Sequence, residues 1–300
     1  MDARSKYTSV LVTYYAGVAR DLPTISPYAR ELARSPRSVW PSDAVLVQAY
    51  RTDPFLCAKL CGVANSIFFN HNHQCVFTVE EALERVGVAY ARNLLREAPS
   101  LPDDINEAEV GVYWAHCMSV AHSARAIASA AVAAPFTADV AHLVAMIHDI
   151  GYLLQIQYSS DALRKVAREL EAGEPHYNST AHASHGEELA RFWYLPNPAI
   201  SAIGCHHDPL ACDDFPSRWL AQVVALSEGI VGRHSQLSSE ISETRESAVV
   251  QDCVRELGIA QGLLTSLQED ADRVYDNCIR LVTNGHPETA RASGTLQVVR

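Results

Sequence analysis

The sequence lacks a long apolar run, and this absence argues against a membrane protein. No segment approaches the roughly 20 apolar residues that a membrane-spanning helix needs. Residues 1–20 also lack the apolar core and the small-residue cleavage site of a signal peptide. We therefore expect a protein that neither spans a membrane nor carries a secretion signal.

Basic residues are scarce relative to acidic ones. The chain holds 24 Lys and Arg against 35 Asp and Glu, and its formal net charge is −11 at pH 7. A protein that binds duplex nucleic acid normally presents a basic face, and anionic membrane surfaces attract basic segments. We expect neither partner. A small phosphorylated ligand stays compatible with this charge, because a bound metal can supply local positive charge.

Paired cysteines are also missing, since none of the eight cysteines forms a C-x-x-C pair. Cys57 and Cys61 lie four residues apart on an apolar helical face, which is the spacing of buried packing residues. This usage favours reduced thiols over a disulfide framework, and it predicts a cytoplasmic protein.

The apolar residues recur with helical spacing almost everywhere, and no segment alternates like a strand for long. The chain is therefore expected to be all-α. Asp53 and Pro54 should begin one helix, and Thr78 with Glu81 forms the capping box of another that should run to residue 95. Other helices are expected over residues 42–50, 106–135, 138–150, 160–172, 181–193, 198–207 and 217–231, with a last pair over about 248–283.

Breaks in this pattern suggest three parts. Residues 99–104 interrupt helicity, and residues 235–247 are polar enough for a linker or mobile loop. We expect an N-terminal helical lobe over 1–100, a helical bundle over 101–234, and a C-terminal helical extension over 235–300 with a poorly ordered tail.

Nine of the thirteen histidines fall between positions 116 and 207. Histidine is a poor default core residue, so this clustering needs a cause. His148 and Asp149 end an apolar helix, where the imidazole and the carboxylate can hold one divalent ion and the carboxylate can bridge to a second. Side chains from separate helices of a bundle can converge on such a pair. The full set of predicted metal ligands is His116, His148, Asp149, His182, His206, His207 and Glu228.

Several of these residues have alternative readings. His116 could be a hydrogen-bonded core histidine, the His206–His207 pair could cap a helix C-terminus, and Glu228 could be a solvated acid. A single metal site explains all seven residues together, so we favour it. Structural or exposed roles are expected for His71, His73, His122 and His142, whereas His185 shares a face with His182 and is a candidate for phosphate binding or for supporting a ligand.

The same residues resemble the HD phosphohydrolase superfamily, specifically its HDOD and HD-GYP branches. The N-terminal half resembles an HDOD module through Leu22-Pro23, Asp53-Pro54, Ala64-Asn65-Ser66 and the 80–95 helix. The central part resembles it through Trp114-Ala115-His116, the HDIG motif at 148–151, His182 with Gly186, Trp193-x-Leu-Pro196, and the run from His206 to Pro209. The similarity covers about residues 20–232 and implies an HD-type metal-binding bundle.

We expect one or two divalent ions. If the site is catalytic, Asp149 would bridge two ions, with His116, His148 and Glu228 on one and His182, His206 and His207 on the other. The sequence departs from the HD-GYP pattern in three ways: Glu228 replaces an Asp, Val112 stands where three-metal enzymes have a Glu, and the loop 208–216 has no GYP signature. Iron, manganese, nickel or zinc suits the mixed nitrogen and oxygen ligands better than magnesium.

Two functions stay open. As a signalling HDOD protein, the chain would bind a partner protein or a phosphorylated nucleotide, with the metal as a structural element or a vestige. As a metal-dependent phosphohydrolase, it would cleave a nucleotide or cyclic dinucleotide, with His148 and Asp149 as the catalytic pair. The HDOD-like N-terminal half and the missing GYP loop favour signalling, and the near-complete ligand set favours an enzyme.

Overall fold

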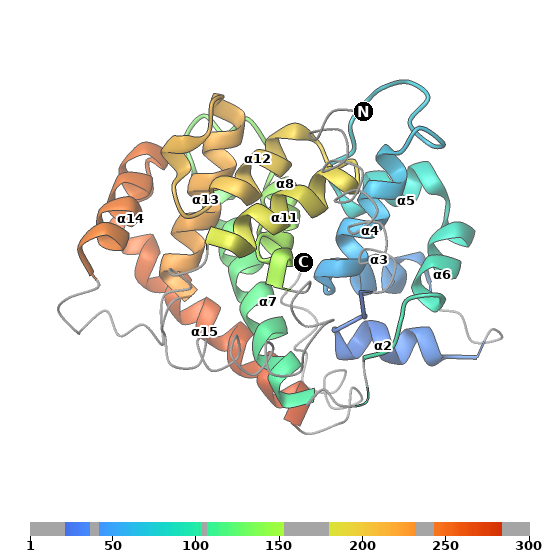
Figure 1. Ribbon diagram of the computed structural model, residues 1–300. Helices are drawn as coiled ribbons and strands as arrows, with labels where there is room; N and C mark the ends of the chain where they lie inside the picture. Colours follow the sequence, from blue (N-terminus) through green and yellow to red (C-terminus); the bar gives the residue numbers. More distant parts are fainter. Residues whose placement is uncertain are drawn as a thin grey trace.

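The computed structural model describes residues 22–36, 42–101, 103, 107–152, 180–231 and 243–283. Every regular element within these ranges is a helix, which confirms the predicted all-α fold class (Figure 1). Among the described helices, none combines the length and the apolar character needed to cross a membrane. The helix expected at 160–172 and the tail from 285 lie outside the described residues.

The N-terminal helices form one side of the molecule. They are α2 (Pro27–Arg34), α3 (Asp43–Arg51), α4 (Pro54–Asn65), α5 (Val79–Val86) and α6 (Val88–Arg96). Asp53 begins α4 as predicted, because its Oδ1 accepts a 2.9 Å hydrogen bond from the backbone of Leu56. Its Oδ2 accepts two further bonds of 2.8 Å from the backbones of Ile25 and Ser26, so the buried carboxylate also fixes the segment before α2.

The helix expected between Thr78 and residue 95 is in fact two helices. The predicted capping box of Thr78 and Glu81 is present at the start of α5. Gly87 then adopts φ +83°, a left-handed conformation that ends α5 and turns the chain into α6. Only glycine adopts this conformation at little cost. The apolar periodicity of the sequence continues on both sides of Gly87, although the helix itself ends there.

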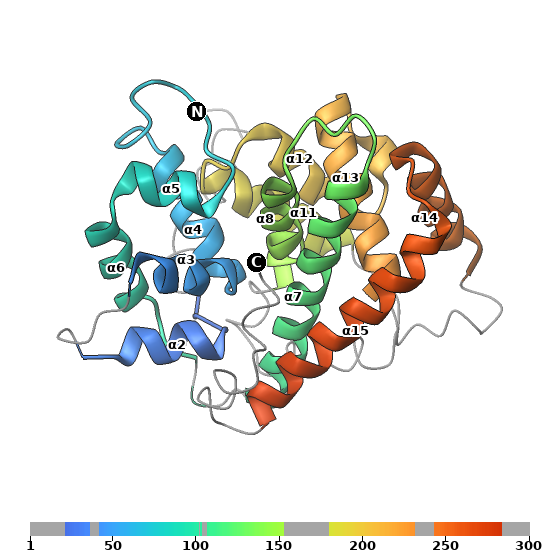
Figure 2. The ribbon, with the colours of Figure 1, turned by 180° about the vertical axis from the view of Figure 1, so that it is seen from behind.

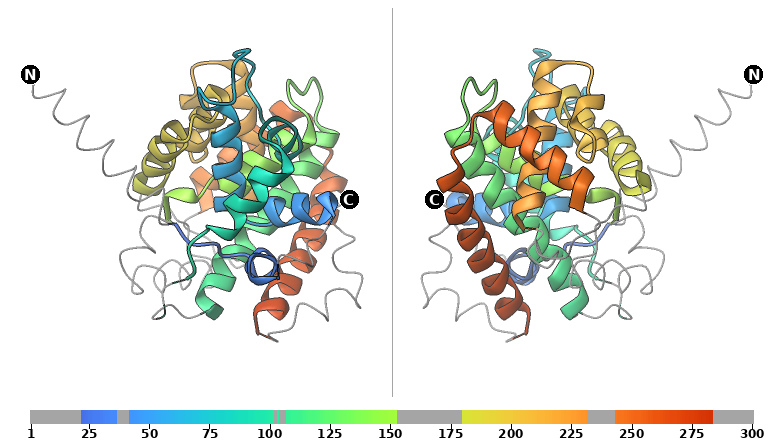
Figure 3. Two further views of the ribbon diagram at one scale, coloured as in Figure 1. Left: turned by 90° about the vertical axis from the view of Figure 1, so that its right-hand side faces the viewer. Right: turned by 90° about the vertical axis from the view of Figure 1, so that its left-hand side faces the viewer.

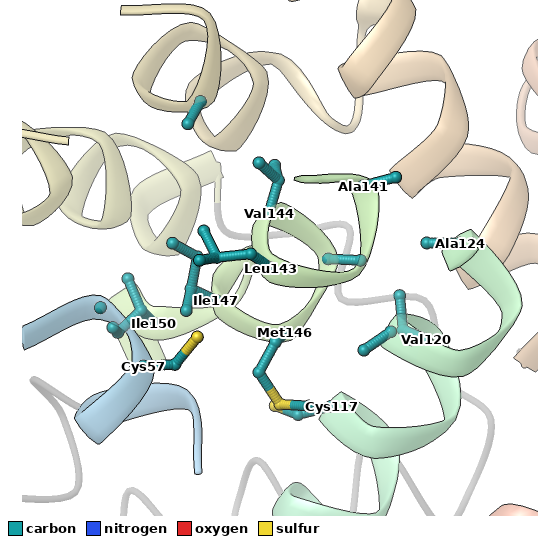
Figure 4. Packing of buried hydrophobic residues seen from close by; sticks show 14 of the residues in the cluster. Cys57, Cys117, Val120, Ala124, Ala141, Leu143, Val144, Met146, Ile147 and Ile150 are labelled. Carbon is teal, nitrogen blue, oxygen red and sulfur yellow. The ribbon is translucent and has the colours of Figure 1, made fainter. Parts of the chain in front are cut away.

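The bundle helices fill the centre of the molecule. They are α7 (Glu107–Ala130), α8 (Ala138–Ile147), α11 (Thr180–Phe192), α12 (Asn197–Cys205) and α13 (Phe215–Val231), with the short 3-10 helix η3 (Pro209–Ala211) inside the predicted loop 208–216. All of α8 from Val140 onward is buried. Figure 4 shows Leu143, Met146 and Ile147 of this helix among side chains from its neighbours.

The last two helices form an outer layer on the bundle. They are α14 (Glu243–Leu257) and α15 (Gln261–Thr283), and they lie in front of the bundle in the right-hand view of Figure 3. The long α15 runs beside α7 (Figure 2), while α14 packs against α13. Because α14 begins at residue 243, the linker predicted over 235–247 is wrong at its C-terminal end.

One cluster of buried apolar side chains extends from Leu22 to Cys278. The N-terminal helices are joined to the bundle by Trp114, whose indole N–H donates a 2.6 Å hydrogen bond to the carbonyl of Thr52, and by the Phe55–Trp193 ring pair. All eight cysteines are free thiols, as predicted, and Cys57 and Cys61 are buried. The bundle is thereby enclosed on two sides, which places its central side chains away from water.

Candidate metal centre

The structure brings all seven predicted ligands together from five parts of the bundle. His116 lies in α7, His148 and Asp149 directly follow α8, His182 lies in α11, His206 and His207 directly follow α12, and Glu228 lies in α13. Their ligand atoms fall into two groups, and within each group these atoms lie within 4.8 Å of one another.

The first ligand group consists of His116, His148, Asp149 and Glu228. The Nε2 atoms of His116 and His148 each lie 3.3 Å from Asp149 Oδ2, and His148 Nε2 lies 3.2 Å from Glu228 Oε1. Two imidazoles and two carboxylates therefore point at one small volume. The side chain of Glu228 is only 16% exposed, so this acid is not the solvated helix residue of the alternative reading.

The second ligand group consists of His182, His206 and His207. His182 Nε2 lies 2.9 Å from His207 Nε2 and 3.3 Å from His206 Nε2. The His206–His207 pair also follows the C-terminus of α12, where its alternative role was a helix cap. These short distances show that the three Nε2 atoms lie around one point. His206 and His207 therefore face His182 and do more than cap the helix.

Asp149 lies between the two groups and presents one oxygen to each. Its Oδ2 faces His116 and His148 at 3.3 Å, whereas its Oδ1 faces His182 at 3.2 Å and His206 at 3.6 Å. The carboxylate is 1% exposed. The carboxylate is therefore placed to contribute an oxygen to either group.

Gly151 of the HDIG motif allows the second group to approach Asp149. A Cβ atom at this position would lie 1.9 Å from the carbonyl oxygen of His182 and 2.8 Å from the backbone nitrogen of Gly186. Both contacts are with backbone, which cannot yield without moving α11. Residue 151 must therefore be glycine, which has no Cβ atom, for α11 to pack this closely on the end of α8.

Backbone carbonyls fix the ring orientation of two ligands. His148 Nδ1 lies 2.7 Å from the carbonyl of Ala145, and His206 Nδ1 lies 2.6 Å from the carbonyl of Ile203. A carbonyl oxygen only accepts hydrogen bonds, so each Nδ1 carries the proton. When either ring is neutral, its Nε2 lone pair is then directed into the centre, which is the tautomer that metal ligation requires.

Two tyrosines that were not predicted from the sequence support the ligands. The phenol of Tyr113 donates a hydrogen bond to the backbone carbonyl of Asp149, and the ring of Tyr152 stacks on His182 with centroids 4.2 Å apart. Tyr113 lies three residues before His116, and Tyr152 follows the HDIG motif directly. Their positions next to these motifs were the available signal.

The electrostatics of the first group favour ionised carboxylates. Burial alone would raise the pKa of Asp149, but the charge of the adjacent His148, followed by the nearby imidazoles of His116 and His182, brings it well below its usual value. The pKa of Glu228 is lowered in the same way, against the effect of burial. Burial would lower the pKa of His148, and the two carboxylates reverse this and hold it well above its usual value. A cation is thus favoured at this point.

The electrostatics of the second group favour neutral imidazoles. Burial lowers the pKa of His206 well below its usual value, and the neighbouring His207 lowers it further. Burial also lowers the pKa of His207. Neutral imidazole and ionised carboxylate are the forms that bind metals.

The residues fit a divalent transition metal by one direct test. Both oxygens of Asp149 are buried, yet neither accepts a well-directed hydrogen bond from the described residues. The imidazole nitrogens lie 3.2–3.6 Å from these oxygens. Such buried acceptors are costly unless something satisfies them, and a cation between the oxygens and nitrogens would do so.

The remaining candidates lie outside both groups. His142 is buried, with its ring nitrogens 3.2 Å from the carbonyl of Ala121 and 3.4 Å from that of Arg51, so its structural role is confirmed. His185 is exposed on α11. Val112 is buried in α7, where it adds no oxygen ligand. Asn65, at the end of α4, has a structural role, because its side-chain amide donates to the carbonyl of Val76 and accepts from the N–H of Val76.

Solved structures share the fold. The MmoQ response regulator from Methylococcus capsulatus superposes with a TM-score of 0.63 at 20% identity, covering 84% of this chain and 99% of that one. A virulence factor from Campylobacter jejuni gives a TM-score of 0.60 at 15% identity, covering 89% and 96%. At these identities the likeness concerns the fold alone.

A curated relative is an uncharacterized protein from Treponema pallidum, 26% identical over 223 residues. The match covers 69% of this chain but only 42% of that protein, so the chain spans less than half of the relative's length. The model of the HDOD domain matches residues 22–209, which include six of the seven predicted ligands and exclude Glu228. Since that match covers well over half of the sequence, the chain belongs to the HDOD family.

Proposed function

We propose that this HDOD protein binds one or two divalent transition-metal ions and uses the loaded centre in signalling, by binding a partner protein or a phosphorylated nucleotide. The observation that carries the proposal is the division of the Asp149 oxygens. Oδ2 faces one ligand group and Oδ1 faces the other. A carboxylate in a structural ion pair does not need to direct its two oxygens at two separate groups, whereas a carboxylate that serves two ions does.

The donor set supports iron, manganese, nickel or zinc over magnesium. Five imidazoles and two carboxylates contribute to the two groups. Magnesium prefers oxygen ligands and retains several waters, while imidazole-rich sites suit the later transition metals. His116, His148 and Glu228 would hold one ion, the three histidines of the second group would hold the other, and Asp149 would serve both.

Phosphate recognition follows from the charge of such a centre. When bound, the ions would supply positive charge for phosphoryl oxygens and would lower the pKa of a water molecule. The protein itself has little positive charge to offer a phosphate, because its net charge is −11. Phosphorylated ligands should therefore bind only to the metal-loaded form.

The first experiment measures metal and phosphate binding together. Protein is stripped with chelator, reloaded with manganese or zinc, and analysed for metal content, then titrated with inorganic phosphate and a cyclic dinucleotide. We expect one or two ions per chain, and phosphate binding only after loading. Asp149→Ala should lose the ions, whereas Asp213→Ala, at an exposed acid of the nearby loop, should retain them. A wild-type chain that binds no ion would disprove the metal centre.

The alternative function is a phosphohydrolase, and the completeness of the ligand set favours it. The loop after His207 argues against efficient turnover of cyclic di-GMP, because it forms the short helix η3 and lacks the GYP signature. Poor substrate positioning alone can cost orders of magnitude in rate. We expect slow or undetectable hydrolysis by fully loaded protein. A turnover number in the ordinary range of ~1–10³ per second that Asp149→Ala abolishes would instead establish the enzyme.

A further inference from the structure

The C-terminal helices contact both helices that supply distant ligands of the first group. His116 comes from α7 and Glu228 comes from α13, and these two helices pack against α15 and α14. The helices α14 and α15 lie beyond the 22–209 match to the HDOD domain. Their contacts therefore connect a segment outside the family match to the proposed metal centre.

The contact between α14 and α13 lies next to a ligand. Gly229 follows Glu228 directly, and a Cβ added to Gly229 would lie 2.6 Å from a methyl group of Val250 in α14. In this turn of α13, Glu228 supplies the carboxylate, and the adjacent Gly229 is in close contact with α14. Farther along the same interface, the side-chain amide of the buried Gln222 donates a hydrogen bond to Glu256.

The contact between α15 and α7 repeats this arrangement. Gly111 lies five residues before His116, and a Cβ at Gly111 would lie 2.7 Å from a methyl group of Val282 in α15. At the other end of α7, the backbone N–H of Val132 donates a 3.2 Å hydrogen bond to the carbonyl of Leu257. The extension is therefore fixed at both ends of the helix that carries His116.

We propose that metal occupancy of the first ligand group and docking of α14–α15 are energetically coupled, so that the C-terminal extension reports whether the centre is loaded. An ion bound by His116 and Glu228 fixes α7 and α13 relative to each other, and that spacing sets the surface on which the extension docks. The coupling is reciprocal, because any factor by which the ion strengthens docking is the factor by which docking strengthens ion binding. This inference rests on the proposed metal centre.

The first measurement follows the extension in the wild-type chain. Hydrogen exchange of the backbone amides of α14 and α15 is compared in chelator and in saturating manganese, with bound metal quantified in the same samples. Local opening of packed helices sets these exchange rates. We expect exchange in both helices to slow by about fivefold or more on loading, within the usual range of coupling between two sites.

The second measurement uses a variant and its rescue. Gly229→Ala should push α14 away without weakening α13, because alanine favours helix over glycine. Metal affinity should fall by about five- to tenfold. Val250→Ala removes the methyl groups that the new Cβ would meet, so the double variant should recover to within about twofold. Gly262→Ala, in open space on α15, is the matched control and should leave affinity unchanged.

The outcomes separate this inference from the metal centre itself. If the wild type binds manganese but exchange in α14 and α15 is unchanged, the coupling is wrong and the metal centre stands. If Gly229→Ala weakens binding and Val250→Ala does not restore it, the effect is local to Glu228 and the coupling through α14 is wrong. If the wild type binds no metal, the proposed centre and the coupling fail together.

Discussion

The phenol of Tyr113 donates a 2.7 Å hydrogen bond to the backbone carbonyl of Asp149. Both residues are buried, and Tyr113 lies one helical turn before His116 on α7. The helix that supplies one ligand thereby fixes the backbone of the residue between the two ligand groups. This bond offers a direct test of how precisely the centre must be held.

Tyr113→Phe should weaken both the fold and metal binding. The substitution removes one of two hydrogen bonds to this carbonyl, which also accepts a 2.9 Å bond from the backbone N–H of Tyr152. Losing one such bond costs about 0.5–1.5 kcal/mol of unfolding free energy. Tyr50→Phe is the matched control, because the phenol of Tyr50 donates a 2.7 Å bond to the carbonyl of Ala91, far from the centre. Urea unfolding should show similar losses in the two metal-free variants, while calorimetry should show weaker metal binding only in Tyr113→Phe. Equal metal affinities would mean that the bond has no positioning role.

Asp149→Ala should abolish stabilisation by metal. A ligand that binds only the folded state stabilises it by roughly 2.7 kcal/mol at one hundred times its Kd. The wild type should therefore melt clearly higher with manganese than with chelator, and the variant should melt at the same temperature in both. Differential scanning calorimetry measures these melting temperatures. A variant that still gains stability from the metal would show that Asp149 is not the shared ligand.

Gly151→Ala should be strongly destabilising. The added Cβ would lie 1.9 Å from the carbonyl oxygen of His182, and backbone atoms of α11 cannot rotate away as a side chain can. Relief requires α11 to move from the end of α8, which should cost at least about 3 kcal/mol and displace His182 from the second group. Urea unfolding measures the loss, with Gly262→Ala as a control expected to be nearly neutral. A change below about 1 kcal/mol would contradict the packing argument.

His142 should make the fold sensitive to acid. Burial, followed by the charges of Arg51 and Arg125, lowers the pKa of His142 from 6.5 to about 4. The unfolded chain therefore takes up the proton first, so the neutral ring stabilises the fold above about pH 6.5 and this contribution is lost as the pH falls toward 4. A shift of this size corresponds to about 3 kcal/mol.

The test compares unfolding free energies of metal-free wild type and His142→Gln between pH 7.5 and pH 4.5. Glutamine does not titrate in this range, so the variant should lose less stability on acidification. His71→Gln, at an exposed position, should keep the wild-type slope. Parallel curves for wild type and His142→Gln would show that the ring does not titrate as its burial requires.

The helical pattern predicted most elements because apolar spacing reflects which face of each helix is buried. It missed the break at Gly87, since an interior glycine costs a helix only about 1 kcal/mol and the apolar spacing continues on both sides. It also missed the start of α14 within a polar segment. Polar composition favours a loop, but α14 is stabilised by contacts with α13 that no local pattern contains.

The candidate site was more predictable than its surroundings. Histidine and acidic residues in an apolar bundle are unusual, so their types alone indicated which side chains should meet. Beyond their positions next to the ligand motifs, nothing in the sequence indicated Tyr113 and Tyr152, because a tyrosine at helical spacing looks the same whether it packs in the core or supports a ligand. The packing of His182 against Gly151 depends on the approach of two helices, which only the folded chain defines. That the seven side chains bind metal stays a prediction.

The separation of 80 positions between His148 and Glu228 also has a consequence for biosynthesis. The chain leaves the ribosome N-terminus first at about 5–20 residues per second, so Glu228 emerges roughly 4–16 s after His148. The second ligand group ends at His207 and is therefore complete in the nascent chain before the first. By then His116, His148 and Asp149 have also been made, so the first group lacks only Glu228. The position that needs Glu228 would be filled last, when α13 has been made.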